Sequence, residues 1–409
     1  MNILFVHQNF PGQFRHLAPA LAAAGHRVDA LAMHRRPPPR GVRQHVYGLT
    51  RKPGKDVHPL LREAEAKVLR AEACAAAMLQ LAQSGYRPDL VICNPGWGEA
   101  LFVKDVFPAA RLVSLLEFFH GTPDADFGFD PEFGQPSIEA RMKLRLKNLA
   151  LVEALLAMDR GVAPTRWQAS RLPAEYRERV DVIFDGIDSQ HVRPDAAARF
   201  AHPALPVPLA AGDPVVTFVN RNLEPYRGYH VFMRALPEIQ RRLPDARVLL
   251  VGADGVSYGA AAPTGTSWKQ RFLDEVAGRL DLGRVHFLGQ LPYGDYLKLL
   301  QVSAAHVYLT YPFVLSWSCL EAMSAGCHVV ASRTAPVLDF IEDGVNGTLI
   351  DFFDATALAA AVERAVRERP KHAALREAAR RTIVERCDLQ SVCLPQWRSM
   401  LSGLMGQPV

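Results

Sequence analysis

The sequence predicts an α/β protein with two Rossmann-like domains that face each other across a cleft. Its 409 residues are more than a single hydrophobic core usually serves. Residues 2–33 and 214–254 repeat one plan, in which an apolar strand, a loop and an amphipathic helix lead into a second apolar strand. Strands that are apolar throughout and alternate with helices are typical of parallel sheets covered on both faces. Domains of this kind bind ligands at the carboxyl ends of their strands.

The first domain is expected over residues 1–192, and its elements follow from the lengths of the apolar segments. Beyond the opening repeat, short apolar runs predict further strands, and longer amphipathic runs predict the helices that cover the sheet. The expected strands are 89–94, 110–119 and 179–185, and the expected helices are 60–82 and 137–158.

The second half begins after an interruption of the pattern. Residues 193–214 are rich in Ala and Pro and lack a periodic pattern, so we expect a linker there. A nucleotide-binding Rossmann-like domain is expected over 215–388, and 389–409 are expected to hold a last helix that packs back on the first domain. The expected strands are 285–290, 304–311, 328–333 and 346–351, and the expected helices are 268–280 and 356–386.

The composition, with 49% hydrophobic and 22% charged residues, predicts a soluble globular protein. The apolar runs are too short to span a membrane, and the first residues do not read as a secretory signal. Six cysteines without a C-x-x-C pair predict free thiols and a cytoplasmic protein. The fourteen histidines show no metal-binding spacing, so we expect no metal and no other cofactor.

Basic residues gather at the start of the chain. The net charge is +5, and the first sixty residues hold nine Lys and Arg against Asp29 and Asp56. Two interpretations stay open, a solvated basic face or attraction to an anionic membrane, an acidic glycan or a nucleotide. The second would bring a cytoplasmic protein to the inner face of the membrane. No nucleic-acid-binding pattern accompanies the charge, so we expect no nucleic acid partner.

Two arginines follow the strand that opens the second half. Arg221 and Arg227 stand in the loop before an expected helix. Backbone N–H groups at a helix N-terminus favour an anion by about 0.3–1 kcal/mol, and guanidinium groups add forked hydrogen bonds to phosphate oxygens. We therefore predict that both arginines bind a diphosphate without a metal. The alternative is a salt bridge to Glu224 in a solvated turn.

A single carboxylate, Glu321, lies in the run YPFVLSWSCLEAMSAG at 311–326. Ser318 and Glu321 have the spacing of a capping box, so the acid could serve only a backbone N–H at the start of a helix. Against this, a carboxylate in such an apolar run is costly unless it is paired or faces a cleft. At a cleft wall it can accept two hydrogen bonds from vicinal ribose hydroxyls.

These segments together resemble the nucleotide-sugar half of the retaining family-4 glycosyltransferases, which have the two-domain GT-B fold. The arginine loop with Gly228, the later run LEAMSAG and the strand HVVAS carry the resemblance. DVIFDGID at 181–188 is similar to the Asn-Gly-Ile-Asp element of the family, with Asp185 in place of Asn. HFLGQLPYGDYLKLLQVSAAHVYL at 286–309 follows the pattern of its base-contacting loop. The resemblance covers nearly the whole chain.

The resemblance implies a role for several residues. Arg221 and Arg227 would bind the donor diphosphate, and Glu321 would bind the ribose. Gly12 in NFPGQFRHL would let the donor phosphate and sugar approach the backbone closely. His120 in LLEFFHGT would lie near the transferred sugar as a catalytic residue, although a loop histidine without a role is an equally open interpretation.

The family usually has two glutamates with seven residues between them; Glu321 corresponds to the second, and Phe313 stands at the position of the first. The acid that contacts the donor sugar is therefore missing, and the resemblance supports a nucleotide site without identifying the hexose. The implied donor-site loop consists of Phe313, Leu315, Ser316, Trp317 and Ser318, and the implied base-side residues are Leu288, Gly289 and Tyr293.

Residues 120–137 form a long segment in which carboxylates alternate with phenylalanines. Such loops inside a compact domain are usually functional, and carboxylates beside aromatic rings suit the hydroxyls and ring faces of sugars. We therefore predict that Asp126, Asp130 and Glu132 contact the acceptor. A Ca²⁺ loop is disfavoured, because the EF-hand spacing is absent. A disordered surface segment is the remaining alternative.

The predicted function is transfer of a hexose from a UDP- or GDP-linked donor to a glycan, a lipid-linked or another hydroxyl acceptor, with retention of configuration. A nucleotide-sugar epimerase, a sugar phosphorylase and a nucleotide-sugar-binding protein without transferase activity are the alternatives. A phosphorylase would need a lysine that binds pyridoxal phosphate, and no candidate is evident. A nicotinamide-dependent dehydrogenase is disfavoured, because no G-x-G-x-x-G follows either opening strand.

Overall fold

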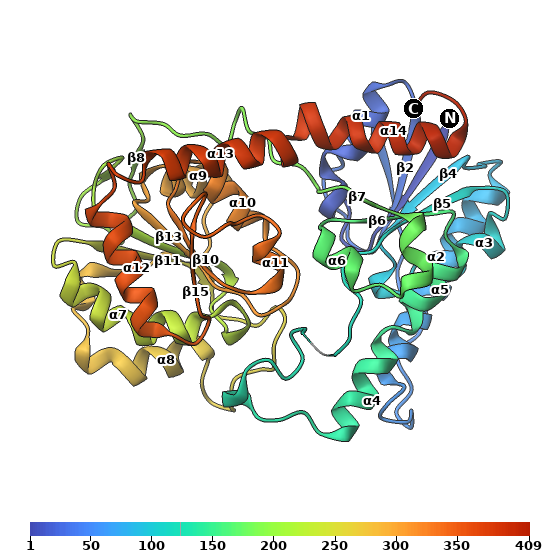
Figure 1. Ribbon diagram of the computed structural model, residues 1–409. Coiled ribbons are helices and arrows are strands. Elements are labelled where there is room, and N and C mark those ends of the chain that lie inside the picture. Colours follow the sequence, from blue (N-terminus) through green and yellow to red (C-terminus); the bar gives the residue numbers. More distant parts are fainter. Residues whose placement is uncertain (123) are drawn as a thin grey trace. The chain divides into compact units, whose positions relative to one another are not determined.

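The computed structural model describes residues 1–122 and 124–409, which fold into two compact units (Figure 1). The first unit joins residues 1–186 with 389–409, and the second unit comprises 187–388. Each is an α/β unit around a parallel sheet, so the predicted class of two Rossmann-like domains is confirmed. No helix within the described residues is both long and apolar enough to cross a membrane.

The first unit contains a parallel sheet of seven strands among the described residues, in the order β3-β2-β1-β4-β5-β6-β7. The chain runs outward from β1 to β3 and then returns to the other side of β1, where Val6 is in register with Cys93. This reversal makes β1 and β4 the pair at which such sheets usually bind ligands. The strands are β1 (Asn2–Val6), β2 (Arg27–Ala32), β3 (Val42–Val46), β4 (Leu90–Cys93), β5 (Arg111–Leu115), β6 (Arg160–Ala163) and β7 (Val180–Val182).

Helices cover both faces of this sheet because alternate strand residues point to opposite sides. Ile3 and Phe5 pack with α1 and α14, whereas Leu4 and Val6 pack with α2 and α3. The C-terminal helix α14 therefore completes the core of the first unit, beside α1 (Figure 1). The helices are α1 (Leu17–Ala23), α2 (Arg62–Gln83), α3 (Val103–Val106), α4 (Ile138–Lys147), α5 (Leu149–Ala157), α6 (Arg166–Ser170) and α14 (Leu394–Met405).

The second unit contains a parallel sheet of six strands among the described residues, in the order β12-β11-β10-β13-β14-β15. Here the order reverses between β10 and β13. Residues 193–214, expected as a linker, lie inside this unit and contribute the short antiparallel pair β8 (Arg199–Phe200) and β9 (Leu209–Ala210). The sheet strands are β10 (Val215–Asn222), β11 (Arg247–Ala253), β12 (Val285–Phe287), β13 (Ala305–Tyr308), β14 (Val329–Ser332) and β15 (Thr348–Ile350).

Helices of the second unit are shorter than the periodicity predicts. The expected helix 356–386 is interrupted at 368–372, where Pro370 cannot donate a backbone hydrogen bond. The expected helix 137–158 of the first unit is likewise divided at Asn148. The helices are α7 (Tyr229–Arg242), α8 (Trp268–Val276), α9 (Tyr293–Val302), α10 (Trp317–Ser324), α11 (Ala335–Leu338), α12 (Ala355–Arg367) and α13 (Ala373–Cys387).

Buried histidines make the fold sensitive to acid. His306 on β13 is fully buried beside Thr217, and burial lowers its pKa to about 3. In the unfolded chain the pKa of histidine is about 6.5, so between these two values the unfolded state binds more protons than the folded state. The free energy of unfolding therefore decreases as the pH is lowered through this range. We expect His306 alone to remove about 2 kcal/mol of unfolding free energy between pH 7 and pH 5. Urea unfolding at both pH values should show that loss, and His306→Gln should reduce it; an unchanged pH dependence would contradict this account.

Candidate functional site

A chain of hydrogen bonds connects the residues that follow β1, β4 and β5 in the first unit. His7 comes directly after β1 and is buried. The backbone N–H of Asn9 donates to His7 Nδ1 at 3.0 Å, so the ring proton must be on Nε2. That Nε2 contacts Gln13 Oε1 at 2.8 Å. Burial lowers the pKa of His7 to about 4, so the imidazole is neutral at pH 7.

Glu117 lies at the other end of this series of hydrogen bonds. Gln13 Nε2 donates to Glu117 Oε1 at 2.9 Å, and Asn94 Nδ2 donates to Glu117 Oε2 at 3.3 Å. Asn94 directly follows β4, and Glu117 lies two residues after β5. The network therefore holds one carboxylate at the carboxyl ends of three neighbouring strands, beside the reversal of strand order.

Gly12 occupies the loop that carries Gln13. Its φ of +47° lies in the left-handed region, and a Cβ built on it would stand 2.5 Å from His7 Cε1. Only glycine avoids both the backbone strain and the clash. The backbone at Gly12 thus lies close to His7 of the same unit, and the glycine allows Gln13 to reach its two partners.

His120, the predicted catalytic residue, follows Glu117 by three residues. It lines a hollow of about 590 Å³ together with Phe119 and residues of α4 and α5. Its backbone N–H and C=O are both bonded to the side chain of Asn148. Within the described part of the chain, His120 Nδ1 is buried without a hydrogen-bond partner. Burial, with Lys147 and Lys67 nearby, lowers its pKa to about 3, so this imidazole is also neutral at pH 7.

The predicted acceptor residues differ in their surroundings. Asp130 is buried and accepts a hydrogen bond from the backbone N–H of Glu132 at 3.0 Å. One of its carboxylate oxygens therefore stabilises the local turn. Glu132 itself is exposed. Burial raises the pKa of Asp126 to about 6. The three acids therefore do not share one environment.

Arg227 is the most distinctive group of the second unit. It ends a short 3-10 turn, Pro225–Arg227, between β10 and α7, and only 4% of it is exposed. Its Nη1 donates to Thr310 Oγ1 at 2.7 Å, to Val314 O at 3.0 Å and to Tyr308 Oη at 3.2 Å. Tyr308 is the last residue of β13 and Thr310 follows it by two residues, so these bonds connect the loop after β10 with the end of the neighbouring strand at the reversal of strand order.

Aromatic rings surround the rest of this guanidinium. Its Cζ lies 5.0 Å from the ring centre of Tyr258 and 5.8 Å from that of Phe313. In the described chain, Arg227 forms no salt bridge, and the position where the resemblance calls for an acid presents the ring of Phe313 instead. Buried arginines are normally paired with an acid. The charge of Arg227 is therefore available to an anionic ligand.

The alternative of a salt bridge to Glu224 is wrong. Glu224 is fully buried, and its carboxylate accepts the backbone N–H groups of Ser257, Tyr258 and Gly259 at 3.0–3.3 Å. The acid thus fixes the loop that places Tyr258 against Arg227. Arg221, at the end of β10, is exposed.

Glu321 on α10 is buried between two tyrosines. Its Oε1 accepts from Tyr293 Oη at 2.8 Å, and its Oε2 accepts from Tyr296 Oη at 2.9 Å. The capping-box alternative is wrong, because the carboxylate bonds hydroxyls of α9 and Ser316 is the residue that precedes the helix. Each carboxylate oxygen accepts one of these hydrogen bonds and has the capacity for a second.

The remaining predicted residues lie on the loops around these groups. The backbone N–H of Ser316 donates to Tyr308 Oη at 2.8 Å, which ties the donor-site loop to the tyrosine that also contacts Arg227. Leu315 is buried, whereas Ser316, Trp317 and Ser318 are partly exposed. On the predicted base side, Leu288 and Gly289 follow β12 and Tyr293 begins α9.

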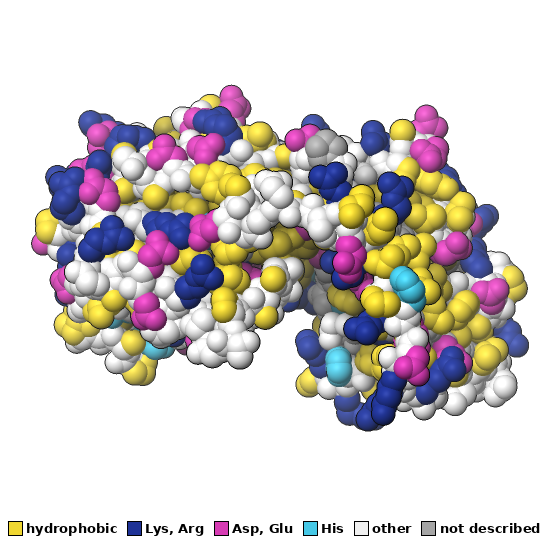
Figure 2. Space-filling model, turned by 90° about the horizontal axis from the view of Figure 1, so that it is seen from below, with side chains coloured by type: hydrophobic (Ala, Val, Ile, Leu, Met, Phe, Trp, Pro, Cys, Tyr) yellow, Lys and Arg dark blue, Asp and Glu magenta, His cyan; other side chains and the backbone are white. Residues whose placement is uncertain are grey.

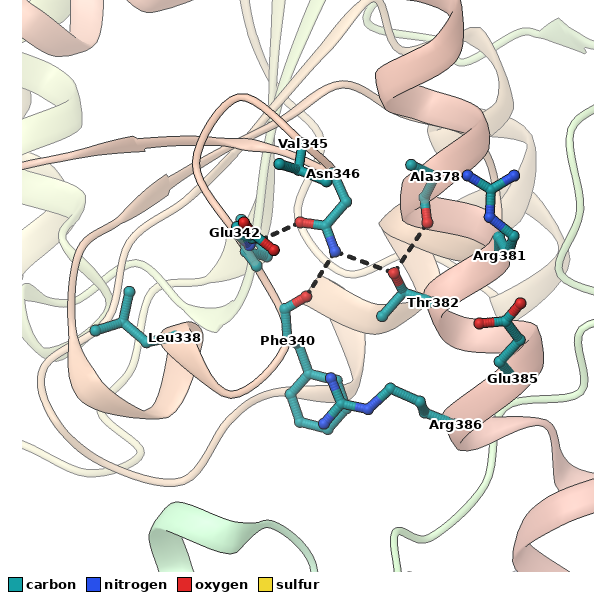
Figure 3. A pocket seen from close by; sticks show the side chains of 11 residues that line it. Leu338, Phe340, Glu342, Val345, Asn346, Ala378, Arg381, Thr382, Glu385 and Arg386 are labelled. Carbon is teal, nitrogen blue, oxygen red and sulfur yellow. Dashed lines mark hydrogen bonds between the residues drawn. The ribbon is translucent and has the colours of Figure 1, made fainter.

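A further hollow of the second unit, about 350 Å³, lies between residues 338–346 and α13 (Figure 3). The side chain of Asn346 is already bonded to Phe340 O at 2.9 Å and Thr382 Oγ1 at 3.0 Å. The guanidinium of Arg386 lies over the ring of Phe340. None of the residues predicted for the nucleotide site lines it, so this hollow is not the candidate site.

The sequence interpretation missed His7, Gln13, Asn94 and Glu117. Their signal is position, because three of the four stand within two residues of the carboxyl end of an apolar strand. In a parallel sheet such residues share one edge, even when they are far apart in the chain.

Comparison with known proteins follows this division into units. Residues 24–192 match the sequence model of the Glycosyl transferase family 4 group, and residues 206–382 match that of the Glycosyl transferases group 1. A phosphatidyl-myo-inositol mannosyltransferase of Mycolicibacterium smegmatis is 32% identical over 208 residues, which are 48% of this chain and 44% of the relative. A D-inositol 3-phosphate glycosyltransferase of Corynebacterium urealyticum is 28% identical over 208 residues, or 49% of this chain and 46% of the relative. The chain thus spans less than half the length of these curated relatives.

Solved structures are similar over almost the full chain. The structure of Anabaena HepE in complex with UDP and glucose has a TM-score of 0.66 and 18% identity, over 98% of this chain and 100% of that one. Sucrose-phosphate synthase from Thermosynechococcus elongatus has a TM-score of 0.73 and 19% identity over the same shares. At such identities the likeness establishes the fold alone. With a glycosyltransferase sequence model matching each unit, the chain belongs to the glycosyltransferases and shares the GT-B fold of these solved structures.

Proposed function

We propose that the protein transfers a hexose from a nucleoside diphosphate sugar to a hydroxyl acceptor, with retention of configuration. The observation that carries the proposal is Arg227, a buried guanidinium without a carboxylate partner at the reversal of strand order in the second unit. A diphosphate would supply the missing negative charge. The N-terminus of α7 begins at the next residues and would add backbone N–H groups.

The leaving diphosphate gains charge in the transition state, and a preorganised cation lowers that barrier without further rearrangement. Three hydrogen bonds hold Arg227 in place before any ligand arrives. We propose Arg221 as a second, exposed phosphate ligand. Retention requires the acceptor to attack on the face from which the diphosphate departs, and no metal is needed for this step.

We propose that Glu321 binds the donor ribose through its free lone pairs, with Tyr293 and Tyr296 fixing the carboxylate. Leu288, Gly289 and Tyr293 would face the nucleotide base. In the first unit, Gly12 with the His7–Gln13–Glu117 network would hold the donor sugar, and neutral His120 would contact it.

The names of similar proteins support a proposal for the classes of donor and acceptor. Relatives carry the names of a mannosyltransferase and an inositol phosphate glycosyltransferase, and the Anabaena protein was solved with UDP and glucose. We therefore propose a UDP- or GDP-hexose donor and a polyol, glycan or lipid-linked acceptor contacted by Asp126, Asp130 and Glu132. We propose a cytoplasmic location, at the inner face of the membrane when the acceptor is lipid-linked.

The test is a transfer assay with UDP- and GDP-hexoses and with inositol phosphate, glucose and lipid-linked acceptors. Proton NMR of the product would report the anomeric configuration, and we expect that of the donor. An inverted product would contradict retention. Epimerised sugar nucleotide without diphosphate release would support an epimerase, and tight binding without turnover would support a binding protein.

A further inference from the structure

Large apolar side chains are exposed along α4 and α5 of the first unit. Ile138 is 69% exposed and Met142 48%, one helical turn apart on α4. Val152 of α5 lines the same hollow as these two residues. Leu149 and Leu156 are three and four residues from Val152, so they project from the same side of α5. We call the side formed by Ile138, Met142, Leu149, Val152 and Leu156 the α4–α5 face.

Single exposed apolar residues are ordinary, but contiguous patches mark interaction sites. The α4–α5 face draws on two consecutive helices and borders a hollow of about 590 Å³. Figure 2 views the molecule from the side on which α4 lies in Figure 1. In the first unit, on the right of this view, hydrophobic side chains gather between lysines and arginines.

Basic residues accompany this apolar face. α4 carries Arg141, Lys143, Arg145 and Lys147 against the single acid Glu139. Lys143 is paired with Glu139 at 2.8 Å. Arg141 and Arg145 are exposed, line the same hollow as Ile138, and form no salt bridge within the described residues. The unpaired positive charge thus lies beside the exposed apolar side chains.

We propose that the α4–α5 face docks on an anionic lipid bilayer. Apolar side chains beside arginines are the combination that inserts at the boundary between lipid headgroups and acyl chains. Arg141 and Arg145 would pair with lipid phosphates, while Ile138 and Met142 enter the apolar layer. Charge complementarity selects an anionic surface, because Arg141 and Arg145 form no salt bridge with the residues that the structure describes.

This inference goes beyond the proposed transfer reaction and does not depend on it, because vesicle binding is measured without any sugar nucleotide. It also assigns the contact to α4 and α5, whereas the basic residues near the start of the chain suggested attraction by charge alone. Matched substitutions in α4 and in the basic segment near the start of the chain can separate these two explanations of membrane binding.

The experiment is co-flotation of the full chain with vesicles of phosphatidylglycerol and phosphatidylcholine, and with phosphatidylcholine alone. We expect binding only to the anionic vesicles. The double variant Arg141→Gln and Arg145→Gln should bind about thirtyfold more weakly, since each basic residue near such a surface contributes about fivefold. The control, Lys52→Gln and Lys55→Gln, removes the same charge from exposed positions of the basic segment and should bind almost as wild type.

A second readout reports insertion. All six native cysteines are buried, so an environment-sensitive dye on Met142→Cys labels α4 selectively. We expect a blue shift on anionic vesicles and none with glycerol phosphate. Equal losses in the Arg and Lys variants would overturn the assignment, because charge alone would then explain binding. A blue shift with glycerol phosphate, or no vesicle binding at all, would also overturn it.

Discussion

Arg227→Gln is expected to weaken nucleoside diphosphate binding by about 2–3 kcal/mol, which is about 30–150-fold in the dissociation constant. Glutamine keeps a donor near Thr310 and Val314 but removes the charge that a diphosphate would neutralise. Arg227 is 4% exposed, so water screens its interaction with a ligand only weakly. Isothermal titration calorimetry with UDP, GDP and ADP measures the loss.

The stability of this variant separates binding from folding. Loss of the hydrogen bonds of Arg227 to Thr310, Val314 and Tyr308 lowers the stability of Arg227→Gln, whereas removal of a buried charge without an acidic partner raises it. Urea unfolding without ligand measures the net effect, and calorimetry is then done where the variant is folded. Arg221→Gln is the matched control, because Arg221 is exposed and its contribution should be smaller. Equal losses in both variants would contradict the special role of the buried guanidinium, and no loss in either would remove the diphosphate assignment.

Glu321→Ala is expected to weaken nucleoside diphosphate binding by about 1–3 kcal/mol, because the ribose loses a charged acceptor. The same change leaves the hydroxyl of Tyr296 without its acceptor inside the protein, so the free energy of unfolding should also fall by about 1–3 kcal/mol. Calorimetry and urea unfolding of one preparation give both numbers.

Tyr296→Phe distinguishes the two effects of Glu321. It removes the buried hydroxyl but leaves the carboxylate, so affinity for the nucleotide should change little. Tyr293→Phe removes the hydrogen bond to the other carboxylate oxygen of Glu321. Tyr293 is the tyrosine that we place next to the nucleotide base. If Tyr296→Phe weakens nucleotide binding as much as Glu321→Ala does, Glu321 acts through the packing of α9. The assignment of Glu321 to the ribose then fails.

The sequence predicted the fold class well because apolar strands and amphipathic helices leave a periodic signal. It did not predict β3, whose residues VRQHV alternate with polar side chains at the edge of the sheet. It also missed β6, four residues that include a glycine. Both strands depend on pairing with neighbours that a single segment does not reveal.

The candidate site was predicted in part for the same reason. Arg227 and Glu321 belong to local patterns, so their positions could be read from the chain. Tyr293 and Phe313 were also predicted for the site, but their contacts with Glu321 and Arg227 were not. Tyr258 was not predicted at all, because it reaches Arg227 only through tertiary packing. His7 and Glu117 are 110 residues apart in the sequence and meet through Gln13 at the edge of the sheet.

The most direct test of the central claim, that the second unit binds a nucleoside diphosphate, is thermal unfolding of the full chain with UDP, GDP or ADP. A ligand that binds the native state raises the unfolding temperature as its concentration increases. We predict a rise with one of these diphosphates, no comparable rise with its free nucleoside, and loss of the rise in Arg227→Gln. An unfolding temperature unchanged by every diphosphate at millimolar concentration would contradict the account.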